Sequence, residues 1–103
     1  MIVRRWRATA ETDKAHLYRD HLERSVLPQL RALPGFLGVT LMQVVSDGEV
    51  ELVVESRWQS MDAVHAFAGP TPGQAVVEPA ARAVLTRYDD FVTHYDVVLE
   101  AGQ

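Results

Sequence analysis

Four histidines are the residues of this 103-residue chain best suited to acid-base chemistry. An imidazole is the usual general base near neutral pH, because it gains and loses its proton in that range. His65 lies beside Val64 at the edge of an apolar helical stripe that includes Phe67, so it can approach a pocket and remove a proton from a bound molecule. His21 borders a second stripe, whereas His16 points to solvent. We select His65 as the candidate catalytic base, with a half-exposed surface histidine as the alternative.

The two tryptophans can supply an aromatic wall and a hydrogen-bond donor. Trp58 ends a predicted strand directly before a helix start, where its indole N–H can donate to a substrate oxygen, and we select it as a second catalytic candidate. Packing in the core is the alternative for Trp58, and a stronger one for Trp6. His94 is expected on the opposite sheet face, in a structural polar network. The predicted substrate-binding wall consists of Trp6, Tyr18, Met42, Phe67 and Tyr95.

Several other chemistries have no support in the sequence. The chain contains no cysteine, which excludes disulfides, thiolate metal sites and cysteine nucleophiles. No histidine pair has the spacing of a helical metal site, so no metal is expected. A net charge of −4 without a basic run argues against nucleic acid or an anionic membrane as a partner. No apolar span is long enough to cross a bilayer, so we expect a cytoplasmic protein.

The elements that must position these side chains are organised around a predicted hairpin over residues 36–58. Asp47-Gly48 joins two strand-like runs, and a type I′ turn needs the positive φ angles that these two residues tolerate. Residues 49–58 alternate between apolar and charged side chains, with few exceptions. Residues 36–46 are apolar on both sides, as is typical of a strand covered on both faces.

The N-terminal part predicts a strand and a helix. Residues 2–9 are compatible with a strand in which Arg4 shares a face with apolar side chains. Residues 12–33 have apolar side chains at spacings of three and four, which predicts an amphipathic helix with Thr12 as its N-cap. Pro28 removes a backbone donor, so we expect a kink near Arg24.

The C-terminal part predicts a helix, an irregular segment and a strand. Ser60 is a good N-cap for a helix over residues 61–68. Residues 74–88 are alanine-rich and predicted to be partly helical, with Pro79 at a helix start or a break. Residues 91–99 alternate as a strand, and we expect Tyr95 to face the helices.

The element order is therefore βαββαβ, within a single domain over residues 1–103. This order predicts a ferredoxin-like α+β fold, in which a four-stranded antiparallel sheet carries the helices on one face. The other face would carry valines among charged side chains. Such a surface on a broad sheet indicates contact with a second subunit.

Five short motifs occur in a characteristic order along nearly the whole chain. They are Arg5-Trp6-Arg7, Pro34-Gly35-Phe36, Arg57-Trp58-Gln59-Ser60-Met61-Asp62-Ala63, His65-Ala66-Phe67-Ala68-Gly69 and Val92-Thr93-His94-Tyr95-Asp96-Val97. Together they resemble the antibiotic biosynthesis monooxygenase family of dimeric α+β barrels. The resemblance implies a homodimer whose sheets face each other, with a pocket in each subunit between sheet and helices.

The resemblance also implies a chemistry. Cofactor-free oxygenases of this family deprotonate an aromatic polyketide, and the resulting anion reduces oxygen directly, so no cofactor is expected. Haem-degrading relatives use an Asn on the first strand together with a Trp and a haem-ligating His. This chain contains no Asn, and the spacing from Trp58 to His65 does not match those enzymes. Haem degradation is therefore the less favoured branch.

Three functions follow as hypotheses, and whether the protein is an enzyme stays open among them. The first is a cofactor-independent monooxygenase that oxidises an aromatic, enolisable small molecule of polyketide or quinol type with molecular oxygen. The second is a non-catalytic small-ligand-binding or stress-related dimeric barrel protein that uses the same pocket. The third is a structural dimer domain without a ligand.

Overall fold

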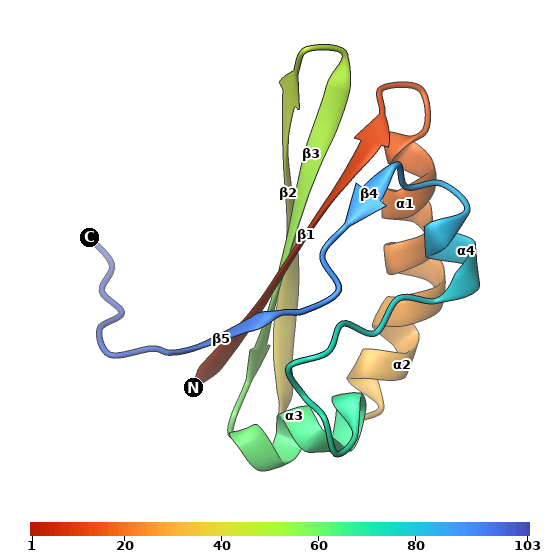
Figure 1. The fold of residues 1–103 in the computed structure, drawn as a ribbon. Helices are drawn as coiled ribbons and strands as arrows, with labels where there is room; N and C mark the ends of the chain where they lie inside the picture. The colour runs from red at the N-terminus through yellow and green to blue at the C-terminus, as the bar shows by residue number, and fades with distance from the viewer.

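The structure, a computed structural model that describes residues 1–103, is built around a long hairpin of β2 (Phe36–Ser46) and β3 (Glu49–Trp58) (Figure 1). The turn residues Asp47 and Gly48 have φ angles of 51° and 77°. Positive φ at both positions is the requirement of the predicted type I′ turn. The local sequence therefore correctly placed the reversal of the chain.

The sheet continues from β3 to β1 (Ile2–Glu11), which pairs with β3 along its whole length. The other edge of β1 pairs with two short strands, β4 (Arg87–Tyr88) and β5 (Thr93–Asp96). All pairs are antiparallel, and the order is β2-β3-β1-β4. This is the predicted ferredoxin-like arrangement. The expected last strand over residues 91–99 is shortened to β5, and β4 is an additional strand in the segment that was predicted to be partly helical.

The first helical segment is continuous but changes its type. It consists of α1 (Ala15–His21), the π-helical turn η1 (Leu22–Val26) and α2 (Leu27–Arg31). Pro28 lies in the first turn of α2 and cannot donate a backbone hydrogen bond, so the wider turn η1 precedes it where a kink was predicted. The predicted start at Thr12 was wrong, because the helix begins after Lys14 without a side-chain cap.

The second helical region has clear local signals at its ends. The hydroxyl of Ser60 accepts a hydrogen bond from the backbone N–H of Ala63, as expected for the N-cap of α3 (Met61–Ala68). Residues 69–78 are mostly irregular, and α4 (Pro79–Arg82) follows with Pro79 at its start. No helix in the chain has the length and hydropathy of a membrane span.

All helices lie on one side of the sheet (Figure 1). We call this side the covered face and the other side the open face. On β1 the covered face carries Ile2, Arg4, Trp6, Ala8 and Ala10, all of which are buried. The open face carries the alternate residues of the same strand, which are half-buried or exposed.

The predicted orientations of Tyr95 and His94 were wrong. In the β1–β5 pair, Tyr95 lies opposite Val3 and His94 lies opposite Arg4. Directly opposite residues of antiparallel strands point to the same face. Tyr95 therefore belongs to the open face, where it is 47% exposed, and His94 belongs to the covered face.

The predicted position of Met42 was also wrong. Met42 lies opposite Val53 in the β2–β3 pair, which places it on the open face. Its exposed fraction is 41%. Because both sides of β2 are apolar, the pattern of β2 alone did not show the orientation, which follows instead from the pairing across the two-residue turn at Asp47-Gly48.

Candidate functional site

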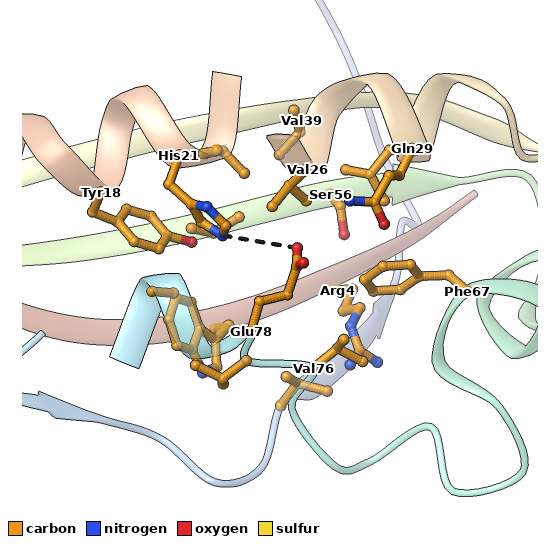
Figure 2. A pocket seen from close by; sticks show the side chains of 17 residues that line it. Arg4, Tyr18, His21, Val26, Gln29, Val39, Ser56, Phe67, Val76 and Glu78 are labelled. Carbon is orange, nitrogen blue, oxygen red and sulfur yellow. Dashed lines mark ion pairs between the residues drawn. The ribbon is translucent and has the colours of Figure 1, made fainter. Parts of the chain in front are cut away.

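A cavity of about 240 Å³ lies between the covered face and the helices (Figure 2). Its walls are mostly apolar and come from the sheet, from the long helical segment, from α3 and from the segment that leads into α4. Such a cavity suits an apolar molecule that carries a few polar groups. The polar or aromatic side chains among the lining residues are Arg4, Trp6, Tyr18, His21, Gln29, Ser56, Phe67 and Glu78.

Arg4 places a buried positive charge in the cavity wall. Its exposed fraction is 5%. One terminal nitrogen, Nη1, donates to the carbonyl of Pro72 at 2.5 Å and lies 3.0 Å from Nε2 of His94. The other, Nη2, donates to the carbonyl of Gln74 at 2.9 Å. These partners are neutral, and no carboxylate of the chain forms an ion pair with Arg4.

The electrostatic setting of Arg4 favours an anion. Burial lowers the pKa of Arg4 to about 10, so the guanidinium stays charged at neutral pH. It also lies 5.5 Å from the ring centroid of Phe67, a cation–π distance. Burying a cation without an anionic partner is unfavourable, and a bound anion in the cavity would relieve that penalty.

His94 completes this end of the site as a neutral acceptor. Desolvation lowers its pKa first, and the positive charges of Arg4 and His65 lower it further. Arginine can only donate hydrogen bonds, so Nε2 of His94 accepts from Arg4 and the ring proton lies on Nδ1. His94 therefore positions Arg4 without competing for a bound anion.

The other end of the cavity contains groups that can exchange a proton. Nε2 of His21 lies 3.8 Å from Oε1 of Glu78, and the His21 side chain is 11% exposed. The ring of Tyr18 lies 6.3 Å from that of His21 and 5.8 Å from that of Trp6, measured between centroids. Burial raises the pKa of the Tyr18 hydroxyl, which therefore keeps its proton.

Three of the predicted wall residues, Trp6, Tyr18 and Phe67, line the cavity. The indole N–H of Trp6 donates to the carbonyl of Asp89 at 2.8 Å, so Trp6 offers its ring rather than a donor to a ligand. Met42 and Tyr95 lie on the open face and are absent from this wall. Substrate binding by the three lining residues stays a prediction.

The two predicted catalytic residues lie outside the cavity wall. Trp58 is completely buried between Phe36 and Phe67, and its N–H donates to the hydroxyl of Ser56 at 2.9 Å. His65 is exposed on α3, and its Nδ1 lies 3.0 Å from the carbonyl of Gly69 at the helix end. Neither side chain therefore reaches this cavity, and their catalytic roles stay a prediction.

Sequence reasoning gave no role to Arg4 and Glu78 and only a minor one to His21. A signal for Arg4 existed, because it is the one charged residue in the buried alternation of β1. His21 was recognised at the border of its helical stripe. Glu78 lies in an irregular segment with no periodicity, so nothing in the local pattern indicated its position. No group of three or more potential metal ligands occurs in the structure.

Solved structures with the same fold include complexes of a haem-degrading protein. The haem-degrader MhuD from Mycobacterium tuberculosis, with two haems in its active site, is 25% identical over 99% of this chain and 100% of its own, with a TM-score of 0.61. A mutant of MhuD with two manganese protoporphyrin IX molecules per active site has a TM-score of 0.69 at 22% identity, with 100% of each chain covered. Rv0793 from Mycobacterium tuberculosis is 25% identical over 98% of each chain, with a TM-score of 0.64.

The sequence comparison identifies the family. No curated protein matches the chain, but the family model described as antibiotic biosynthesis monooxygenase matches residues 1–79. This range contains β1, the hairpin and α3, together with most of the cavity lining. The match and the haem-degrader at 25% identity support a monooxygenase-type or small-ligand-binding function. By its sequence and its fold, the chain belongs to the antibiotic biosynthesis monooxygenase family.

Proposed function

We propose that this protein is a cofactor-independent monooxygenase that oxidises a small aromatic, enolisable molecule with molecular oxygen. The observation that carries the proposal is Arg4, a buried cation that faces an apolar cavity and has no carboxylate partner. A low-dielectric wall with a fixed positive charge stabilises an enolate or phenolate strongly. The aromatic rings of Trp6 and Phe67 provide stacking surfaces for the substrate.

The proposed reaction balances without a metal or flavin. A ring methylene beside a conjugated carbonyl loses a proton, and the negative charge moves to the carbonyl oxygen near Arg4. The carbanion form reduces oxygen and forms a carbon–oxygen bond. The resulting peroxide anion takes up the proton that the substrate lost and then loses water as a new carbonyl forms, so one oxygen atom enters the product and the other leaves as water. The protein stabilises the anion and keeps bulk water out.

The size of the cavity supports a substrate of a few fused rings. Its volume of about 240 Å³ lies just below the range of roughly 300–1,000 Å³ that is common for drug-sized ligands. A porphyrin, with four pyrrole rings joined in one macrocycle, is larger than a system of a few fused rings. Haem is the main competing ligand, because the structural neighbour MhuD contains two haems in its active site.

Oxygen uptake tests this proposal directly. Metal-free protein is incubated with a panel of anthrones and hydroquinones in an oxygen electrode, with buffer alone as the control. We expect uptake that increases in proportion to protein concentration for at least one anthrone. No uptake above buffer would contradict the monooxygenase, and tight anthrone binding without uptake would favour the non-catalytic binding protein.

A haem titration separates the two ligand classes. We expect the absorption spectrum of haem to stay close to that of free haem when the protein is added. A shifted spectrum that saturates at one or two equivalents, together with no anthrone binding, would replace the proposed substrate class by haem.

We also propose that the protein forms a homodimer through its open face. Large apolar side chains on this face are exposed, with exposed fractions of 41% for Met42, 56% for Val44 and 47% for Tyr95. Val3 and Val53 extend the same surface. A second copy that buries on the order of 1,600 Å² in total would remove these side chains from water.

A further inference from the structure

The polar groups of the cavity gather at two separate ends. Figure 2 shows Arg4 beside Phe67 at one end and His21 beside Tyr18 at the other, with Val26 and Glu78 between them. The contacts agree, because Arg4 packs on Phe67 while Trp6, two residues further along β1, packs on Tyr18. Two residues of a strand span about 7 Å, a distance that one flat ring system covers.

The end with His21 is built to accept a proton. The His21 side chain lines the cavity and is almost completely shielded from solvent. Its 3.8 Å separation from Oε1 of Glu78 is too long for a direct hydrogen bond, so a third group can approach both atoms. The groups that face His21 are Tyr18 from α1, Glu78 from the segment before α4 and, at the far end, Arg4 from β1.

The charges around His21 support this role. The Glu78 carboxylate stabilises an imidazolium as it forms, which is the usual contribution of an acidic partner to a histidine base. Burial raises the pKa of the Tyr18 hydroxyl, so Tyr18 keeps its own proton and does not compete with His21 for the proton of the substrate. Arg4 is too far along the cavity to take part in the proton transfer itself.

We propose that His21 is the catalytic base of this cavity and that Glu78 is its positioning residue. The inference rests on the proposed function and adds the group that starts the reaction. The acidic hydrogen of the substrate moves to the imidazole at one end, and the electron pair of the broken bond moves through the ring to the oxygen beside Arg4. Proton and charge thus separate to opposite ends of one ring system.

An ionisation measurement tests the base without turnover. The probe is para-nitrophenol, whose anion absorbs visible light and whose nitro group carries charge at the end opposite the hydroxyl. At a pH just below the pKa of the free probe, wild-type protein should bind para-nitrophenol mainly as the anion. His21→Gln should lower the bound-anion fraction about tenfold and Glu78→Gln less, whereas His16→Gln on the exposed side of α1 should match wild type.

A turnover measurement tests the role of His21 as the base in the oxidation itself. With an anthrone, His21→Gln should lower kcat about a hundredfold, at the low end for loss of a general base, and a substrate already ionised in solution should restore the wild-type rate. Glu78→Gln, a half-exposed isosteric change, serves as the variant that keeps the fold.

Equal ionisation of the probe in wild type and His21→Gln would overturn the inference, as would failure of wild type to bind it. If wild type ionises the probe through His21 but consumes no oxygen, the base stands and the proposed monooxygenase fails.

Discussion

Arg4 and Arg5 are neighbours on β1, yet they face opposite sides of the sheet and experience different environments. Arg4 is 5% exposed and bonds only neutral acceptors. Arg5 has a 41% exposed side chain, and its Nε lies 4.0 Å from Oε2 of Glu55. The same residue type is thus a ligand-binding candidate on the covered face and an ordinary member of a charged surface on the open face. Burial and the available partners make the difference.

The aromatic residues follow the same division. Tyr18 is buried against the covered face beside Trp6. Tyr95 lies on the open face and leaves 47% of its surface accessible. The helices of the chain pack against the covered face and shield its apolar side chains from water. The open face has apolar side chains that nothing in the same chain covers. The first face is suited to a small molecule and the second to another copy.

The largest effect is expected from a charge on the open face. Val53→Asp should weaken dimerisation by about a hundredfold or more, because both copies would bury an additional carboxylate opposite Arg7, which already pairs with Asp89, at a cost of several kcal/mol. Val45→Asp, at a 61% exposed position near the hairpin turn, is the matched control. Sedimentation velocity over a concentration series measures both variants. A wild-type monomer at micromolar concentration, or unchanged association of Val53→Asp, would contradict this assignment of the open face.

A somewhat smaller effect is expected on the covered face. Arg4→Gln should weaken binding of the para-nitrophenol anion by about ten- to a hundredfold, since a hydrogen bond to a charged group contributes roughly 1.5–3 kcal/mol. Arg7→Gln removes the same charge from the exposed side of β1 and should leave binding unchanged. Isothermal titration calorimetry measures the affinities. Equal affinities of Arg4→Gln and wild type would show that the buried cation does not bind the anion.

Substitution of Trp58 tests whether this completely buried residue has a structural role only. Trp58→Phe should lower the free energy of unfolding by about 2 kcal/mol, because it leaves a small void and removes the N–H donor to Ser56. Urea denaturation measures this loss. Ligand affinity should change less than twofold, since Trp58 does not line the cavity. A large loss of affinity at unchanged stability would return Trp58 to the site.

The smallest expected effect is a pH dependence from His94. Its pKa is lowered below the ordinary value of 6.5 in the folded protein, so the unfolded chain binds a proton first as the pH falls. The contribution of neutral His94 is therefore present above about pH 6.5 and is lost as the pH falls towards the folded-state pKa. We expect a change below about 1 kcal/mol, because His94 is half-exposed and solvent screens its interactions.

Thermal unfolding of wild type and His94→Gln between pH 7.5 and 5.5, about one unit on either side of the ordinary histidine pKa, measures this contribution. The substitution should flatten the acid side of the stability profile, and His16→Gln should not. Parallel profiles for all three proteins would contradict the assignment.

Local chemistry was sufficient to predict much of the fold. Asp47-Gly48 predicted the hairpin turn, Ser60 predicted the start of α3, and Pro28 predicted the irregularity that the structure has as η1. In each case the deciding interaction lies within a few residues of the chain. Backbone φ preferences, a side-chain cap and a missing donor act at short range, so the sequence by itself determined these features and the element order that follows from them.

Only the tertiary structure decided which way Tyr95 faces. Its strand has apolar residues on both sides, and a one-residue change of register turns every side chain to the other face. The register that settles the matter pairs Tyr95 with Val3, at the other end of the chain. For Met42, by contrast, the two-residue turn at Asp47-Gly48 sets the pairing with Val53, so the hairpin sequence already contained the information.

The site depends on the same long-range effects. Arg4 donates its hydrogen bonds to Pro72, Gln74 and His94, which lie more than sixty positions away in the sequence. His21 meets Glu78 across a comparable separation. The sequence determined that β1 carries a charge among buried positions. Only the tertiary structure determined that this charge has no carboxylate partner and that it shares a cavity with His21. Burial and pairing depend on residues that are far apart in the sequence and that no local pattern connects.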